Sequence, residues 1–407
     1  MKIKLKFRKI KSSELIFFSG LFLWILQSYM IQTDFLRFYG YSLCTVVRLA
    51  SLSLLVFKII FIDYKYSKIT FCLCIICLLI AMSTQFTTSQ TTIDTFINVF
   101  IIIMAARNIP FEKITYFIFV VSSIGFLITI SFAFLGVINN SVIITNGEKR
   151  YYLGFDYVSF ASIYLVNIIF CGVYSYTAKK KNSLPWTYII LALGMDYFIY
   201  KMTATRLTFG IILIFVLLYI IVEKFHIPLF NNKRMMGIIS IGLFPIMGLG
   251  TYWLSSSYIA TDEKWMIFNK ILSNRLLLNK RAITMYNIKW FGQVIEFNTD
   301  FNAGIDSYMY IDSGYMNLLL QYGIIAFITV LIIYSFMLWM SIKETNNVLI
   351  IWLICVCIYN MINGMLLSPV TTNSSLFAIW GLATEARKYE KRKIKNGYTY
   401  RGSNRYI

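Results

Sequence analysis

Residues 313–341, SGYMNLLLQYGIIAFITVLIIYSFMLWMS, contain no charged side chain. The hydrocarbon core of a bilayer is about 30 Å thick, and a helix needs about 20 apolar residues to cross it. This stretch therefore predicts a membrane-spanning helix. Its apolar residues are continuous and do not alternate with polar ones, which argues against a strand of a membrane β-barrel.

The composition extends this prediction to the whole chain. Of 407 residues, 58% are hydrophobic and 14% are charged, whereas soluble domains are about 25% charged. We expect an all-α integral membrane protein whose residues 1–407 form a single polytopic domain. About twelve apolar segments are candidate transmembrane helices: 13–32, 40–62, 69–84, 92–107, 114–138, 157–177, 185–202, 205–222, 235–255, 313–341, 348–364 and 369–384.

The basic residues predict the orientation. Lysine and arginine concentrate in the cytoplasmic connections of membrane proteins. With twelve spans and both termini cytoplasmic, most of the 38 lysines and arginines fall on the cytoplasmic side, including those of the basic tail at 385–407. This tail can be interpreted as an anchor to anionic lipid headgroups or as a nucleic-acid-binding segment. We favour the anchor and expect no nucleic-acid partner.

One large outer loop, periplasmic or extracellular, is predicted at residues 256–312. Its charge is polarised along the sequence, because basic residues fill its first part and acidic residues follow. The basic residues are Lys264, Lys270, Arg275, Lys280, Arg281 and Lys289, and the acidic ones are Glu296, Asp300, Asp306 and Asp312.

The basic part of this loop has the spacing of an amphipathic helix. Arg275, Asn279, Tyr286 and Lys289 would share one face, beside an apolar strip formed by Leu278, Ala282 and Met285. Such a helix can lie at the membrane interface with its cations toward an anion. The alternative is a helix whose charges are simply solvated or face lipid headgroups.

Two further arginines, Arg150 and Arg206, lie at predicted outer boundaries, where basic residues are normally sparse. Arginine presents a planar fork that matches phosphate oxygens. Together with Arg275, they would form an outer surface suited to a lipid-linked diphosphate. The alternative is that their side chains extend to the lipid headgroups.

No nucleotide-binding loop or metal-ligand cluster is evident in the sequence, and the single histidine, His226, falls in a predicted cytoplasmic connection. We expect no cofactor and no metal. An enzyme of this kind would require a substrate that reaches it through the membrane already activated.

Four short motifs occur in a characteristic order: RYYLGF at 150–155, TATR at 203–206, SNRL at 273–276 followed by FGQ at 291–293, and DSGYMNLLLQYGII at 312–325. In this order, and with the large late outer loop, they resemble the bacterial O-antigen and capsular polysaccharide polymerases, the Wzy family. The motifs cover about 30 residues, while the similarity in topology covers the whole chain.

The resemblance implies a membrane glycosyltransferase of the GT-C type in the bacterial cytoplasmic (inner) membrane. Such an enzyme transfers a growing glycan from one polyprenyl (undecaprenyl) diphosphate carrier to a repeat unit on a second carrier, at the outer face. The implied partners are the lipid-linked oligosaccharides, membrane lipids, a chain-length regulator and a flippase.

The resemblance also implies roles for particular residues. Arg275 and Arg206 would stabilise the diphosphate leaving group, and Asp312 would act as the base or accept a hydrogen bond from a sugar hydroxyl. Asp312 can alternatively be the N-cap of the helix that follows it. Arg150, Arg281, Lys289 and Tyr315 are the expected substrate-binding residues.

Three other functions remain open. A flippase or transporter of lipid-linked repeat units also suits twelve spans, although no repeat is visible between the two halves of the chain. An O-antigen ligase is disfavoured because such ligases usually carry a histidine in the last large outer loop, and this chain has none there. A cell-wall glycan polymerase of the shape and division type would share the chemistry.

Overall fold

The computed structural model describes residues 12–88, 95–145, 147–180, 183–230, 232–272, 274–298, 309–364 and 366–383. The predicted basic tail at 385–407 lies outside these ranges, as do Asp300 and Asp306 of the large loop. The described chain is mostly helical, with one short β-hairpin.

Eight helices in the described ranges are long and apolar enough to cross a membrane. The chain is therefore a multi-pass α-helical membrane protein. The helices are α1 (Ser12–Ile31), α2 (Leu36–Phe57) with its π-helical end η1 (Lys58–Ile62), α3 (Lys68–Thr88), α5 (Phe111–Phe134), α6 (Phe160–Lys180), α8 (Arg206–Tyr219) with η2 (Ile220–Lys224), α9 (Lys233–Ser257), and α12 (Gly314–Asn317), η4 (Leu318–Tyr322) and α13 (Gly323–Lys343) in succession.

The other four predicted spans coincide with helices that are not among these eight. They are α4 (Phe96–Ala105), α7 (Trp186–Thr203), α14 (Asn347–Tyr359) and the short helix Ser374–Ala383, which begins with the 3₁₀ turn η5 (Ser374–Phe377).

The expectation of a regular helix over 369–384 was wrong in its first part, because residues 366–373 form turns. Their backbone is hydrogen-bonded by buried side chains from distant helices. Asn167 of α6 donates to the carbonyl of Val370 at 2.9 Å, and the Tyr334 hydroxyl of α13 donates to the carbonyl of Leu366 at 2.9 Å. Irregular backbone is tolerated inside a membrane protein where the surrounding protein satisfies its polar groups in this way.

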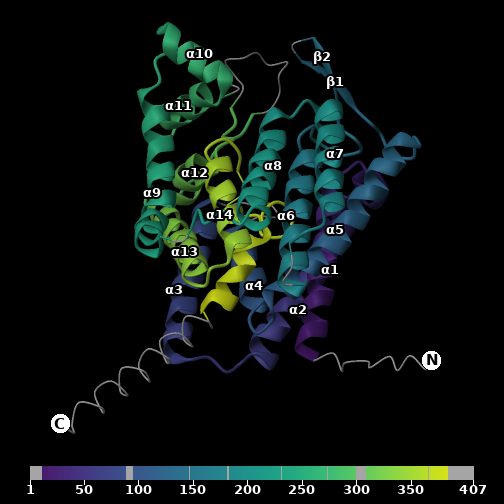
Figure 1. The fold of residues 1–407 in the computed structure, drawn as a ribbon, viewed down its shortest axis with the longest axis vertical. Helices are drawn as coiled ribbons and strands as arrows, with labels where there is room; N and C mark the ends of the chain where they lie inside the picture. Colours follow the sequence, from purple (N-terminus) through teal and green to yellow (C-terminus); the bar gives the residue numbers. More distant parts are fainter. Residues whose placement is uncertain are drawn as a thin grey trace, which may run out of the picture.

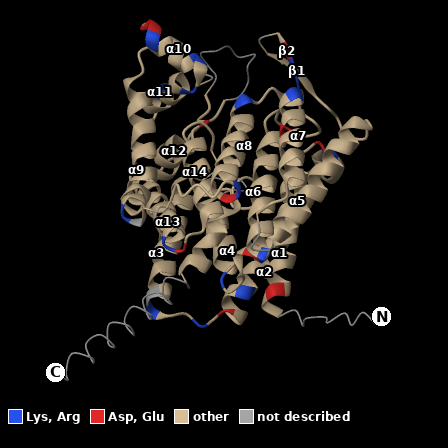
Figure 2. Cartoon of the chain, in the orientation of Figure 1, with Lys and Arg blue, Asp and Glu red and all other residues tan. Residues whose placement is uncertain are grey.

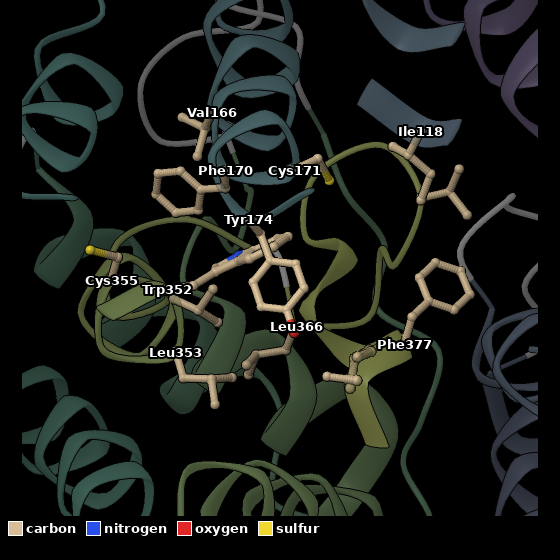
Figure 3. Packing of buried hydrophobic residues seen from close by; sticks show 14 of the residues in the cluster. Ile118, Val166, Phe170, Cys171, Tyr174, Trp352, Leu353, Cys355, Leu366 and Phe377 are labelled. Atoms are coloured by element: carbon tan, nitrogen blue, oxygen red, sulfur yellow. The ribbon is translucent and has the colours of Figure 1, made fainter. Parts of the chain in front are cut away.

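Helix α6 is the centre of the bundle, with 78% of its most apolar stretch buried. Phe170 stacks on Phe215 of α8 at a ring-centroid distance of 3.9 Å and meets Trp352 of α14 edge-on at 5.7 Å. Figure 3 shows this packing between α6 and α14. Close interdigitation of this kind is what holds helices together in a bilayer, where burial from water contributes little.

The large loop and the hairpin lie at the same end of the bundle, opposite the end where α1 begins (Figure 1). The loop contains α10 (Glu263–Ile271) and α11 (Arg275–Met285), and the hairpin pairs β1 (Val142–Thr145) with β2 (Glu148–Tyr151). We call this the hairpin end. Charged residues gather mainly toward the two ends of the bundle, and its middle is largely uncharged (Figure 2).

The apolar stretch 313–341 is not one continuous helix, because it breaks at Gly323, whose φ is 88°. The chain that follows α11 supplies the hydrogen bonds at the break. The N–H groups of Ile324 and Ile325 donate to the carbonyls of Lys289 and Trp290 at 3.0 and 3.2 Å, and the Gln293 N–H donates to the carbonyl of Gln321 at 3.0 Å. The segment 289–293, which includes the FGQ motif, therefore docks the large loop onto the broken helix.

Two glycines make this docking possible. A Cβ on Gly323 would lie 2.6 Å from the Trp290 carbonyl oxygen and would also collide with the backbone nitrogen of Gly292. A Cβ on Gly292, whose φ is 85°, would collide with the carbonyl oxygen of Gln321. Both clashes are with backbone atoms, which cannot rotate away as a side chain can.

We expect Gly323→Ala to lower the free energy of unfolding by about 1–3 kcal/mol, because it combines overpacking with a backbone conformation that alanine disfavours. The measurement is the thermal unfolding midpoint of the detergent-purified protein, followed by tryptophan fluorescence. Gly194→Ala in α7 is the control, since no neighbouring atom lies within 4 Å of its added Cβ. Equal midpoints for the two variants would show that the break does not depend on Gly323.

Candidate functional site

Arg275 is the first residue of α11, and two asparagines fix it there. Asn274 adopts the left-handed conformation with φ of 63°, which asparagine tolerates better than most residues. The side-chain oxygen of Asn269 accepts hydrogen bonds from the N–H groups of Leu276 and Leu277 at 3.1 and 3.2 Å. The SNRL motif thus starts a helix at a defined point and presents its arginine there.

The guanidinium of Arg275 contacts two residues that are distant in the sequence, Ile362 and Asp312. Its Nε donates to the carbonyl of Ile362, just after α14, at 2.7 Å. One terminal nitrogen lies 3.7 Å from a carboxylate oxygen of Asp312. At this distance the two groups form an ion pair but not a hydrogen bond. Because a guanidinium has five N–H groups, Arg275 retains donors for a further anion.

Asp312 is held beside Arg275 by the backbone that follows it. Ser313, not Asp312, caps α12, since its side chain accepts from the N–H of Met316. The Gly314 N–H donates to the carbonyl of Asn360 at 3.0 Å, and a Cβ on Gly314 would collide with the side chain of Asn360. The alternative interpretation of Asp312 as the N-cap was therefore wrong, and its carboxylate is available to Arg275.

Burial raises the pKa of the Asp312 carboxyl above its ordinary value of 3.8, and the charge of Arg275 opposes that rise. A carboxylate whose pKa is raised is a stronger base than an exposed aspartate. The positive charge of Arg275 stabilises the ionised form of Asp312 in this partly buried position.

Tyr157, between β2 and α6, lies within reach of the same charges. Partial burial raises the pKa of its phenol, the charge of Asp312 adds to the rise, and the charges of Arg275 and Arg150 oppose it. Arg150 is placed by the hairpin, where its Nε donates to the carbonyl of Thr203 at the end of α7, at 2.8 Å. The charges of Arg150, Arg275 and Asp312, which come from distant parts of the chain, therefore all influence the Tyr157 phenol.

Arg206 is at the same end of the bundle but is much more exposed. Its side chain is 76% exposed and lies 3.8 Å from the carboxylate of Glu148 on the hairpin. An exposed ion pair of this length contributes little to stability. Arg206 therefore lies at the hairpin side of the site, and the structure describes no contact between it and Asp312.

The predicted long helical face in the loop was wrong beyond Met285, where α11 ends because Tyr286 adopts an extended conformation. Lys289 is exposed and lies in the segment that docks at Gly323. Arg281 is half-buried further along α11, on a different face from Arg275. Of the predicted apolar strip, Ala282 is buried as expected, but Met285 is 63% exposed, and Leu276, which lies outside the strip, is buried instead.

Tyr315 is in the core and not at the surface of the site. Its side chain is 0% exposed, and its hydroxyl donates to the carbonyl of Cys357 in α14 at 3.0 Å. This position gives Tyr315 a role in packing α12 against α14.

Two contributors to the site were not identified from the sequence. The segment 360–364 after α14 holds both Arg275 and Gly314 through backbone carbonyls, which leave no signature in side-chain patterns. Tyr157 was assigned to the start of a span. Its position just before the uncharged run of α6 was the one sequence feature that could have placed it outside the span.

Comparison of the chain with known protein families, with characterised proteins and with solved structures gave no match.

The Arg275–Asp312 pair should show energetic coupling. We expect a double-mutant cycle of Arg275→Ala, Asp312→Ala and the double variant to give a coupling free energy of about 0.5–1.5 kcal/mol, because the two groups are partly shielded from water. The measurement is equilibrium unfolding of the detergent-purified proteins. The exposed pair Arg206–Glu148 serves as the reference, with coupling near zero. Equal coupling in the two cycles would contradict the arrangement described here.

Proposed function

We propose that this protein is a polysaccharide polymerase of the bacterial cytoplasmic membrane. It would transfer a growing glycan from one polyprenyl diphosphate carrier to a repeat unit on a second carrier. We assign the hairpin end to the outer face of the membrane, both chain termini to the cytoplasm, and twelve membrane-crossing segments of the GT-C type to the bundle. The order of the four sequence motifs, together with the meeting of Arg275 and Asp312, supports the proposal.

The observation that carries the proposal is the 3.7 Å separation of Arg275 and Asp312 at one end of a membrane bundle. Glycan transfer from a diphosphate carrier breaks the bond between the anomeric carbon and a phosphate oxygen. Negative charge then grows on the leaving diphosphate. An arginine fixed in a partly buried site and retaining free donors is suited to stabilise that charge.

The second requirement is activation of the acceptor hydroxyl. The Asp312 carboxylate, with its raised pKa, would accept the proton of that hydroxyl as it attacks the anomeric carbon. Arg150 would bind further phosphate oxygens from the hairpin side, and Arg206 would attract the anionic headgroup from a greater distance. The lipid-linked substrates would come from a flippase, and a chain-length regulator is a further expected partner.

Loss of the Arg275 guanidinium should abolish most of the activity. We expect Arg275→Ala to reduce elongation about 100-fold or more, corresponding to about 3 kcal/mol of lost transition-state stabilisation. Arg206→Ala should cost less than about tenfold, because its side chain is largely exposed to solvent. The measurement is elongation of a purified lipid-linked repeat unit, seen as a ladder on a gel without added nucleotide or metal.

Arg234→Ala is the matched control for this experiment, since Arg234 is an exposed arginine at the start of α9, outside the site. It should elongate at the wild-type rate. If folded wild-type protein makes no ladder from its cognate substrate but moves that lipid across reconstituted vesicles, the protein is a flippase and the polymerase proposal is wrong.

The rate should depend on the ionisation of Asp312. Only the carboxylate can accept a proton, so the rate falls as the pH drops through the pKa of Asp312, which lies above 3.8. We expect the loss of activity on acidification to begin at a higher pH than it would for an exposed aspartate. Asp312→Asn should be inactive at every pH. A pH-independent rate, with the protein folded throughout by fluorescence, would exclude Asp312 as the base.

A further inference from the structure

An open pocket of about 480 Å³ lies at the end of the bundle opposite the hairpin end, where the chain connects α2 to α3 (Figure 1). It is lined by residues from two segments that are distant in the sequence, namely Ile62, Asp63, Tyr64, Lys65, Arg107 and Asn108. Ile62 is the last residue of the span formed by α2 and η1, and Lys68 begins the next helix, α3. The pocket therefore opens where two membrane-crossing helices end, at the level of the membrane surface.

A buried ion pair fixes the wall of this pocket. The Lys58 ammonium is 0% exposed and pairs with the Asp63 carboxylate. It also donates to the backbone carbonyls of Ala105 and Arg107 at 2.7 and 3.0 Å. The other carboxylate oxygen of Asp63 accepts a hydrogen bond from the Asn108 side chain at 3.2 Å. The charges of Lys58 and Asp63 thus neutralise each other, and the three donors of the ammonium are all used.

Two further cations, Arg107 and Lys65, remain at the pocket. One terminal nitrogen of Arg107 donates to the carbonyls of Asp63 and Lys65 at 2.8 and 2.6 Å. The guanidinium also lies 3.9 Å from the ring centre of Tyr66, and the Lys65 ammonium lies 5.6 Å from that of Tyr64. Within the described part of the chain, no carboxylate lies within 4 Å of either cation. The guanidinium is held in place, yet its Nε and its other terminal nitrogen retain donors for an anion.

Exposed apolar side chains lie next to the pocket. Ile60 and Phe61, which precede Ile62 in η1, are 55% and 64% exposed, and Tyr64 is 61% exposed. Apolar side chains at the end of a span face lipid, and aromatic residues are typical of the boundary between lipid and water. A phospholipid would place its phosphate at this level and its acyl chains beside Ile60 and Phe61. A soluble phosphate would make no use of these side chains.

We propose that this pocket binds the phosphate headgroup of an anionic phospholipid through Arg107 and Lys65. The planar fork of arginine matches two phosphate oxygens, and lysine adds a second positive charge. Basic pockets between membrane helices bind anionic headgroups in this way. The bound lipid would join the connection between α2 and α3 to the turn between α4 and α5. This inference goes beyond the proposed polymerase function and does not depend on it.

The experiment uses three probes. Phosphatidylglycerol is anionic, phosphatidylcholine with the same acyl chains has no net charge, and inorganic phosphate lacks the acyl chains. Full-length protein in a neutral detergent is titrated with each lipid, and the Kd is obtained from the rise of the thermal unfolding midpoint with lipid concentration. Inorganic phosphate at millimolar concentration is then added as a competitor.

We expect Lys65→Glu, which reverses a charge, to raise the Kd for phosphatidylglycerol about tenfold, and Arg107→Gln, which removes one, to raise it about fivefold. Lys65→Glu should keep the wild-type unfolding midpoint without lipid, because its side chain is exposed. Lys68→Glu is the matched control, since Lys68 is an exposed lysine three residues further along that does not line the pocket. Its Kd should stay within about twofold of wild type. Phosphatidylcholine should bind at least about tenfold more weakly than phosphatidylglycerol, and inorganic phosphate should not displace the lipid.

Three results would overturn the proposal. Equal losses in Lys65→Glu and Lys68→Glu would show a general attraction to basic surface and no pocket. Equal Kd values for the two lipids would show that the headgroup charge is not recognised. Displacement by inorganic phosphate would make the ligand a soluble phosphate and not a lipid. None of these results bears on glycan elongation, so the proposed polymerase function is tested separately.

Discussion

The backbone contact between Gly292 and Gly323 is the constraint on which the rest of the site depends. A helix that breaks inside a membrane protein exposes N–H and carbonyl groups that lipid cannot satisfy. Here the segment 289–293 provides the missing partners, and the same contact anchors the large loop to the bundle. The helix break and the position of the loop are therefore one structural feature.

This anchoring determines where Arg275 lies. A small apolar cluster beneath the loop joins Ala282 of α11 to Ile311, Met316 and Leu320 on the chain leading into the broken helix. Asp312 is adjacent to Ile311, so the packing that holds α11 also holds the carboxylate. The segment after α14 completes the arrangement through the carbonyls of Asn360 and Ile362. A rigid surround of this kind keeps two opposite charges close without a direct hydrogen bond, which leaves the arginine able to bind a second anion.

The local sequence was sufficient to predict the apolar helices and the gathering of charged residues at the ends of the bundle. Long uncharged runs and the bias of positive residues are strong signals. It was insufficient wherever a distant segment decides the conformation. The run 313–341 has no charged residue to mark the break, whose hydrogen bonds are supplied by residues 289–293. The turns at 366–373 depend on hydrogen bonds from Asn167 and Tyr334. Helix α11 ends earlier than predicted because the chain after it forms hydrogen bonds with the backbone on either side of Gly323.

The candidate site was predicted in part. Arg150, Arg275 and Asp312 were selected from the sequence, and the structure pairs Arg275 with Asp312. The N-cap was misplaced by one residue because aspartate and serine are both good caps, and adjacent candidates cannot be ranked without the backbone conformation. Tyr315 was selected for its distance along the helix from Asp312, but burial against Cys357 removes it from the surface.

The central claim is that the diphosphate near Arg275 leaves as a glycosidic bond forms. The most direct test counts products during a reaction of purified protein with its lipid-linked repeat unit. We predict that one molecule of free polyprenyl diphosphate appears for each repeat unit joined, with neither product formed by Arg275→Ala. Transfer of the intact lipid between leaflets of a vesicle, with no polyprenyl diphosphate released, would contradict the account.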